Sequence, residues 1–242
     1  MTGPVQSGDG PYVGPRPFEA GQQLYGRDPQ LWTLRDLLIA ERIVMLYSPS
    51  GAGKTSLIQA ALIPALEEEG FLVRPIVRAG LDPTTIVQQH PPGANRYTLS
   101  SIFSLEHGTT PEDSWLRPDL AALTLPAYLS HSSATSTPSD LEVLIFDQFE
   151  ELLTADPTDH LAKQQFFEQL GTVLRSRKRW ALFSLREDYI AGLDPYLRCI
   201  PNELKTRFRL DLLREHEARL AIQLPARSAR RLPQRSDAVP PR

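Results

Sequence analysis

Three short runs of apolar residues stand out along an otherwise mixed sequence. They lie within residues 43–46, 141–147 and 180–185. A continuous apolar run of this length is typical of a strand buried on both faces, as the strands of a parallel sheet are. The pattern therefore predicts three core strands.

Two weaker patterns indicate strands at the margins of the same sheet. Residues 71–78 are mostly apolar but include Pro75, which has no N–H to donate and is therefore expected at a sheet edge. Residues 206–212 alternate between charged and apolar side chains, and we expect a last strand there.

Apolar residues at helical spacing lie both before and after the first strand. A helix is expected from Pro29, a residue favoured in the first helical turn, with four leucines on one face. Helical spacing resumes over residues 57–66. Pro64 should kink this second helix or start a new turn, and Gly70 should end it.

The later part of the chain carries one strong helical pattern and one weak region. Residues 160–178 form an amphipathic helix, and a short helix is expected at 214–224. Residues 79–140 show only helical pieces, near 99–105 and 116–129. We interpret this stretch as a variable insertion and not as a second domain.

The composition fits one globular core. Of the 242 residues 41% are hydrophobic, and the single cysteine, Cys199, excludes an internal disulfide framework and fits a reducing compartment. No apolar run is long enough to cross a membrane, and residues 1–17 lack the basic and apolar regions of a signal peptide. We therefore expect a cytoplasmic protein without a membrane partner.

The ends of the chain differ from its middle. Residues 1–11 are rich in Gly, Pro and Ser, and residues 226–242 in Arg and Pro, so we expect both to be disordered around one domain at 12–225. Basic stretches at 175–179 and 227–235 are the only hints of a nucleic-acid partner. We do not expect one, because cations at a helix C-terminus are ordinary and the net charge is −3.

The strongest chemical signal follows the first strand. Residues 48–55 read Ser-Pro-Ser-Gly-Ala-Gly-Lys-Thr and precede the second helix. Glycines let the backbone turn sharply, and inward N–H groups with a helix N-terminus favour an anion. Lys54 can reach the β- and γ-phosphates, and the Thr55 hydroxyl can ligate Mg²⁺. The pattern is that of a phosphate-binding loop in which Ser48 replaces the first Gly; the alternative is an ordinary turn before a helix.

An acidic group follows the second core strand. That strand ends at Asp147, and Glu150 and Glu151 come soon after. A carboxylate at the end of a parallel strand beside a phosphate loop can hold Mg²⁺ directly or through water. Either glutamate can polarise a water molecule. The alternative is a core strand followed by a solvated acidic helix start.

An arginine ends the third core strand. Arg186 lies where open α/β sheets bind ligands, so it is a candidate for sensing a γ-phosphate. The alternative is a salt bridge to Glu187 or Asp188.

Taken in order, these landmarks resemble the STAND class of P-loop ATPases, the signal-transduction ATPases with numerous domains, and more closely its bacterial novel STAND branch. The resemblance covers most of residues 12–225. The segments that carry it are GPRPF at 14–18, LYGRD at 24–28, PSGAGKTSLI at 49–58, ALIPAL at 61–66, DQFEEL at 147–152 and LREDY at 185–189.

The resemblance implies a nucleotide site made by two segments. The first looks like the adenine and ribose contact, and the second like the phosphate loop. The residues implied are Tyr25, Gly26 and Arg27 in the first, and Ser50, Gly51, Ala52, Gly53, Lys54, Thr55 and Ser56 in the second.

The resemblance also implies roles for the acidic and basic residues. Thr55 and Asp147 look like the Mg²⁺ ligands, with Asp147 as the Walker B acid. Glu151, or failing that Glu150, looks like the acid that orients the attacking water. Arg186 looks like the sensor arginine.

The fold implied is a three-layer α/β domain with a parallel sheet of order 5-1-4-3-2, of the additional-strand catalytic-glutamate type. Two departures matter. Ser48 in place of Gly is expected to loosen the loop. Family members usually continue into a helical lid and further modules, so a chain that stops soon after residue 225 is expected to be truncated.

The expected activity is slow hydrolysis of ATP with Mg²⁺, by in-line attack of water on the γ-phosphate, in a nucleotide-dependent signalling or conflict-system switch that binds ATP or ADP. The alternatives are a non-catalytic, nucleotide-held assembly module that self-associates through this domain, or a P-loop kinase, for which no acceptor pocket can be named. A GTPase is disfavoured because no Asn-Lys-x-Asp motif is present.

Overall fold

The computed structural model of the chain describes residues 18, 24–89, 91–108, 115–133 and 141–228. Five strands form one sheet of order β2-β3-β4-β1-β5, and every neighbouring pair is parallel. This confirms the predicted α/β class and the 5-1-4-3-2 order. The strands are β1 (Ile43–Ser48), β2 (Phe71–Val73), β3 (Leu141–Phe146), β4 (Arg179–Arg186) and β5 (Arg207–Arg209).

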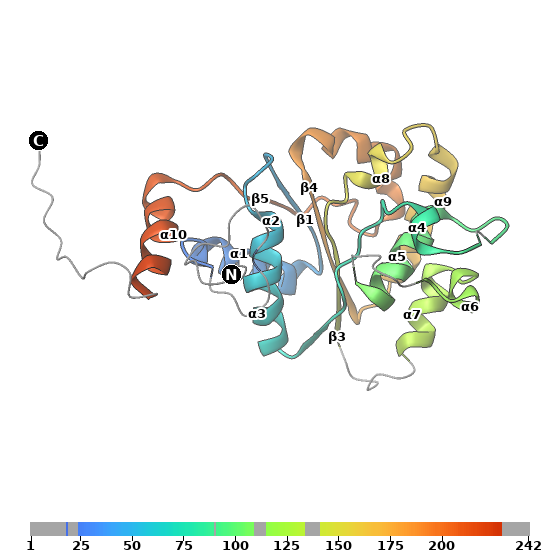
Figure 1. Cartoon of the computed structure of the whole chain (residues 1–242), viewed down its shortest axis with the longest axis horizontal. Coiled ribbons are helices and arrows are strands. Elements are labelled where there is room, and N and C mark those ends of the chain that lie inside the picture. Colours follow the sequence, from blue (N-terminus) through green and yellow to red (C-terminus); the bar gives the residue numbers. More distant parts are fainter. Residues whose placement is uncertain (1–17, 19–23, 90, 109–114, 134–140, 229–242) are drawn as a thin grey trace, which may run out of the picture.

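Apolar residues alternate between the two faces of the sheet and build two cores. In β1, Val44 and Leu46 pack on one side, while Ile43 and Met45 pack on the other. The first core is covered by α1 (Asp28–Glu41), α2 (Lys54–Leu57), the π-helical turn η1 (Ile58–Leu62) and α3 (Ile63–Glu68). The second core lies under α5 (Arg96–His107), α7 (Leu125–Ser133), α9 (His160–Leu174) and the 3₁₀ segment η2 (Glu187–Cys199), which gives three layers (Figure 1).

Two prolines shape the elements beside the sheet. Pro64 opens α3, and the helix adopts a π turn at η1 directly before it, so the predicted kink takes this form. The strand predicted for residues 71–78 is wrong in its second half. Regular pairing ends at Val73, and only Val77 pairs again, opposite Phe146. Pro75 explains the break, because it cannot donate to the neighbouring strand.

The insertion packs onto the sheet domain. Besides α5 and α7 it contains the single turns α4 (Pro83–Ile86) and α6 (Pro118–Ala121). Asn95 caps α5 by accepting from two backbone N–H groups, those of Tyr97 and Thr98. Buried side chains of the insertion join the core under α9 and do not form a separate one.

The C-terminal helix is longer than the sequence predicts. The short helix expected at 214–224 is α10 (Glu215–Ser228), which continues through Pro225. The segment expected to be disordered from residue 226 therefore begins inside a helix, and residues 229–242 and 1–11 lie outside the described residues. In the described ranges no helix has the length and apolar character needed to span a membrane.

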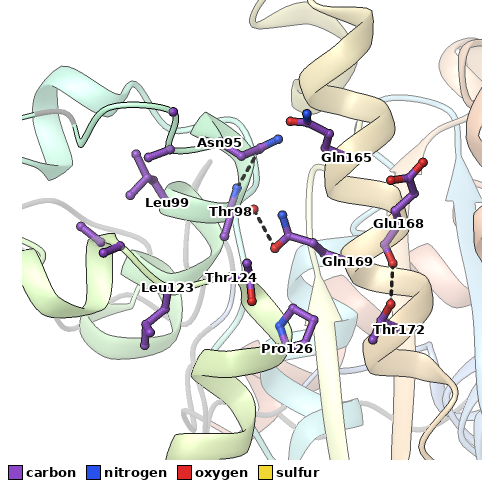
Figure 2. Close-up of a pocket in the computed structure, with 14 residues that line it drawn as sticks. Asn95, Thr98, Leu99, Leu123, Thr124, Pro126, Gln165, Glu168, Gln169 and Thr172 are labelled. Carbon is purple, nitrogen blue, oxygen red and sulfur yellow. Dashed lines mark hydrogen bonds between the residues drawn. The ribbon is translucent and has the colours of Figure 1, made fainter.

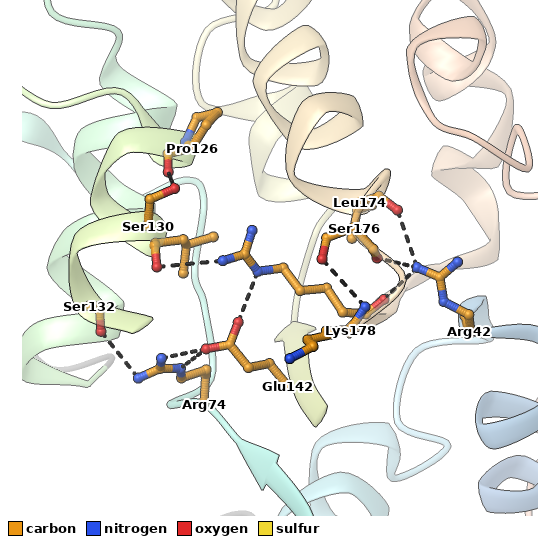
Figure 3. A network of polar contacts seen from close by, with 11 residues as sticks. Arg42, Arg74, Pro126, Ser130, Ser132, Glu142, Leu174, Ser176 and Lys178 are labelled. Carbon is orange, nitrogen blue, oxygen red and sulfur yellow. Dashed lines mark hydrogen bonds and ion pairs between the residues drawn. The ribbon is translucent and has the colours of Figure 1, made fainter. Parts of the chain in front are cut away.

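A buried carboxylate ties three strands together at the amino edge of the sheet. Glu142 of β3 lies between Arg74, which follows β2, and Arg179 of β4, at 2.5 Å and 2.9 Å (Figure 3). Its side chain is only 6% exposed. Burial alone would raise the pKa of Glu142, but hydrogen bonds from Arg179 and Arg74 outweigh it and lower the pKa. Stability from this group is therefore present above the ordinary glutamate range and is lost as the pH falls through the lowered pKa.

Replacing this carboxylate should destabilise the domain strongly. We expect Glu142→Ala to lower the free energy of unfolding by about 3–5 kcal/mol, because both guanidinium groups lose their shared buried partner. The measurement is urea unfolding at pH 7. As a control, Lys205→Ala removes an ion pair with Glu203 whose side chains are 75% and 47% exposed, and should change stability by less than about 1 kcal/mol. Equal effects of the two variants would contradict this role for Glu142.

Candidate functional site

The segment between β1 and α2 forms a loop at the carboxyl edge of the sheet. Gly51 and Gly53 have φ angles of +78° and +88°, the region that favours glycine. A Cβ atom built on either would meet nothing within 4 Å, so the backbone conformation and not crowding selects glycine. The loop lines a cavity of about 350 Å³. Its lining residues are Ser50, Gly51, Ala52, Gly53, Lys54, Thr55, Ser56, Asp147, Gln148, Glu150 and Arg186.

Ser48 closes the base of this loop. Its hydroxyl donates to the Pro49 carbonyl at 2.7 Å and accepts from the Lys54 ammonium at 2.8 Å. The side chain is fully buried. The expectation that Ser48 loosens the loop is therefore not what the structure shows, since the hydroxyl adds two bonds that glycine could not make. Burial lowers the pKa of Lys54, while the nearby carboxylates of Glu150 and Asp147 oppose that shift.

Thr55 and Asp147 meet across the cavity floor. The Thr55 hydroxyl donates to Asp147 Oδ2 at 2.7 Å. Asp147 is 3% exposed, and its Oδ1 is buried without a hydrogen-bond partner among the described residues. A buried carboxylate oxygen without a partner is costly unless a further ligand satisfies it. Mg²⁺ takes one or two protein oxygens together with waters and phosphate oxygens, so this pair fits that ion.

The two glutamates of the acidic turn have different surroundings. Glu150 lines the cavity, and its carboxylate accepts from the backbone N–H of Arg186 at 3.3 Å. Burial raises the pKa of Glu150. Glu151 begins α8 (Glu151–Thr154) and is instead ion-paired with Arg78, which donates to it through Nε at 3.0 Å. Of the two residues suggested by the sequence, only Glu150 lies among those that line the cavity.

Arg186 reaches the cavity from the end of β4. Its guanidinium donates to Asp188 at 2.7 Å and lies 5.5 Å from the ring centre of Tyr189. The side chain is 41% exposed, so this pairing is easily exchanged for another anion. Arg186 thus combines both readings of the sequence: it pairs with Asp188 and also lines the cavity.

The segment expected to contact the nucleotide base lies behind the loop. Arg27 is 6% exposed and donates to the Ala52 carbonyl at 2.8 Å. Gly26 has φ +79°, and a Cβ there would lie 2.6 Å from the Glu217 carbonyl oxygen of α10. Glu217 in turn accepts from Gln30 at 2.8 Å. Tyr25, Gly26 and Arg27 are not among the residues that line the cavity, and Arg27 supports the loop from outside.

One residue of the site and one that supports it from outside were not predicted from the sequence. Gln148 lines the cavity and has a φ of +51°. A positive φ is uncommon for residues other than glycine, and glutamine is not among the exceptions. Its place directly after the strand-ending Asp147 was a usable signal. Glu217 lies in α10 far along the chain, and nothing local connects it with Gly26.

Comparison with known proteins places the chain in a family. The sequence matches Novel STAND NTPase 1 over residues 11–235. The chain belongs to this family. It therefore carries a STAND-class P-loop NTPase domain, a class of nucleotide-binding domains. A comparison with curated proteins gives no match.

Solved structures agree with the NTPase fold. The chain is similar to the Walker-type ATPase PABY2304 of Pyrococcus abyssi, with a TM-score of 0.58, 11% identity, and coverage of 89% of this chain and 62% of that one. It is also similar to the ORC2 protein of Aeropyrum pernix in its ADPNP–ADP complexes, with a TM-score of 0.58, 13% identity, and coverage of 86% and 54%. The chain thus spans little more than half the length of these proteins, and at such identities the likeness concerns the fold.

The contact between Gly26 and α10 generates a stability prediction for this STAND domain. We expect Gly26→Ala to destabilise the protein by about 1–3 kcal/mol more than Gly70→Ala does, because forcing a methyl into packed backbone adds to the strain of a positive φ. Gly70 is the matched control: its φ is +86°, but a Cβ there meets nothing within 4 Å. Urea unfolding of both variants measures the difference. Equal losses would show that α10 does not hold this segment.

Proposed function

We propose that this STAND domain binds ATP with Mg²⁺, hydrolyses it slowly, and uses the difference between its ATP and ADP states as a switch. The observation that supports this most is the convergence of Lys54, Thr55, Asp147, Glu150 and Arg186 on one cavity. They come from the start of α2 directly after the loop, the turn after β3 and the end of β4. Two cations and two carboxylates with a hydroxyl are the groups that phosphoryl transfer requires.

The loop would hold the phosphates through its backbone N–H groups and Lys54. In the structure the Lys54 ammonium donates to the Ser48 hydroxyl at 2.8 Å and makes no hydrogen bond or ion pair with the described carboxylates of Asp147 and Glu150. A neutral hydroxyl is a weaker competitor than a carboxylate, so the ammonium can turn to the β- and γ-phosphates at little cost. Thr55 and Asp147 would hold Mg²⁺, which neutralises charge on the phosphate oxygens when bound.

Glu150 would orient the attacking water. The water oxygen forms a bond to the γ-phosphorus while the bond to the β–γ bridging oxygen breaks, which yields ADP and inorganic phosphate. Glu150 accepts a hydrogen bond from that water and takes its proton, which then passes to the phosphate product. Burial raises the pKa of Glu150, which makes its carboxylate a stronger proton acceptor than an exposed glutamate.

Arg186 would distinguish the two nucleotide states. Its partner Asp188 is exposed, so a γ-phosphate can replace it. ADP offers no such group, and Arg186 then stays with Asp188. A ligand shifts a conformational equilibrium only through such differential contacts. The signalling role and any self-association of this domain rest on this proposed exchange.

Removing the lysine tests nucleotide binding. We expect Lys54→Ala to weaken ATP binding about 10- to 100-fold, because a hydrogen bond to a charged group contributes about 1.5–3 kcal/mol. Isothermal titration calorimetry with Mg²⁺ measures this change. Lys205→Ala, which removes an exposed lysine paired with Glu203, should bind ATP as the unchanged protein does. ATP binding that survives Lys54→Ala intact would exclude the phosphate loop as the site.

A pair of neighbouring substitutions tests hydrolysis. We expect Glu150→Gln to lower ATP turnover about 10²- to 10⁴-fold while ATP still binds, since removing a general base has an effect of this size. Glu151→Gln is the matched control, one residue away and paired with Arg78, and should retain most of the turnover. Phosphate release under saturating ATP is the measurement. Unchanged turnover in Glu150→Gln would contradict Glu150 as the general base. Absence of turnover in the unchanged protein would instead favour the non-catalytic, nucleotide-held module.

A further inference from the structure

A second cavity lies in the part of the domain for which the sequence predicts least. It has a volume of about 440 Å³ and lies between α5, the segment that joins α6 to α7, and α9 (Figure 2). Small-molecule sites usually measure about 300–1,000 Å³. None of its lining residues lines the cavity at the phosphate loop. The two cavities are therefore separate.

One amide side chain has a fixed orientation in this cavity. Gln169 extends from α9 toward α5, and its Oε1 accepts from Leu125 N at 2.8 Å and from the Thr98 hydroxyl at 3.2 Å (Figure 2). Two donors on one oxygen decide which end of the amide is nitrogen. The Nε2 group is thus left as a donor in the cavity wall, with no acceptor among the described residues.

An acceptor lies beside that donor. The Thr98 hydroxyl uses its proton on Gln169, so its oxygen keeps lone pairs for a donor from outside. Asn95 does not compete, because its oxygen caps α5 and its nitrogen donates to the Ala162 carbonyl at 2.6 Å. Leu99, Leu123 and Pro126 supply apolar wall. The cavity thus offers a fixed donor next to a fixed acceptor, between apolar surfaces.

The charge of the lining excludes one class of ligand. Among the described residues of the lining, Glu168 is the one charged side chain, and none is a lysine, arginine or histidine. A phosphate or carboxylate would therefore meet a like charge without a compensating cation.

We propose that this cavity binds a small uncharged molecule with a planar ring whose edge carries a hydrogen-bond acceptor next to a donor, as a nucleobase or an aromatic carboxamide does. The acceptor receives the Gln169 amide proton, and the donor is directed to the Thr98 oxygen. The ring packs on Leu123 and Pro126. This site is independent of the proposed ATP hydrolysis.

The test uses cytidine and nicotinamide as probes on the full chain with Mg²⁺ and excess ADP, so that the phosphate loop is not available to them. Calorimetry or ligand-observed NMR should detect submillimolar binding of at least one probe, and CMP should bind more weakly than cytidine. Cytidine binding alone identifies a nucleobase site, and nicotinamide binding alone a carboxamide site. Binding of neither probe overturns the proposal.

Two variants assign the binding to this cavity. Gln169→Glu keeps the acceptor for Leu125 and Thr98 but loses the donor, and should weaken the bound probe at least tenfold. Gln165→Glu, one turn away on the same helix, adds the same charge without removing that donor and should have a smaller effect. Ala122→Trp fills the cavity from an exposed position and should abolish binding while leaving the melting temperature unchanged. Probe binding that persists in both Gln169→Glu and Ala122→Trp overturns the proposal.

Discussion

Hydrogen bonding between β1 and β4 runs in parallel from Ile43 opposite Ala181 to Ser48 opposite Arg186. β3 joins the other edge of β4, with Phe146 opposite Phe183. Because all three strands point the same way, their carboxyl ends reach one edge of the sheet, where the phosphate loop, the acidic turn and Arg186 follow. A shift of either pairing by two residues would move one of these groups by about 7 Å, since a strand rises about 3.3 Å per residue. The position of the site thus depends on backbone pairing within the sheet.

Within that frame the charged groups of the site already have internal partners. Lys54 is bound to Ser48, Thr55 to Asp147, and Arg186 to Asp188. Each of these bonds satisfies a group that would otherwise be unpaired. A phosphate oxygen can replace Ser48 or Asp188 as the acceptor, and the oxygens of Thr55 and Asp147 can serve as ligands of a metal ion. The loop itself is supported from outside by Arg27, whose buried guanidinium meets the Ala52 carbonyl. Different residues therefore support the loop and face an anionic ligand: Arg27 does the first, and Lys54 and Arg186 do the second.

The sequence predicts what local pattern can encode. Apolar runs were sufficient for the core strands, and the glycine-containing segment and the strand-ending carboxylate for the positions of the loop and Asp147. The order of the strands followed from the family resemblance. Contacts between segments that are distant in the sequence could not be predicted from local pattern. Nothing adjacent to Glu151 shows that Arg78 will pair with it, and nothing near Arg27 shows that it faces the loop. The 3₁₀ segment η2 was missed for a related reason, because it contains Pro195 and depends on packing against α9 and β4. The cavity beside Gln169 likewise arises from three segments that only the folded chain brings together.

The order of strands also governs how the site can form during synthesis. β1 ends at Ser48, but its two neighbours in the sheet begin only at Arg179 and Arg207. A ribosome therefore exposes the apolar β1 and the loop after it long before either pairing partner has been made. Pairing of such an exposed strand with another chain is a recognised route to aggregation. Early intermediates must therefore prevent that pairing. Such distant pairings also slow folding, since long loops have to close first. A nucleotide would be able to stabilise only the nearly complete domain, so it would act late in folding, as a ligand of the finished sheet.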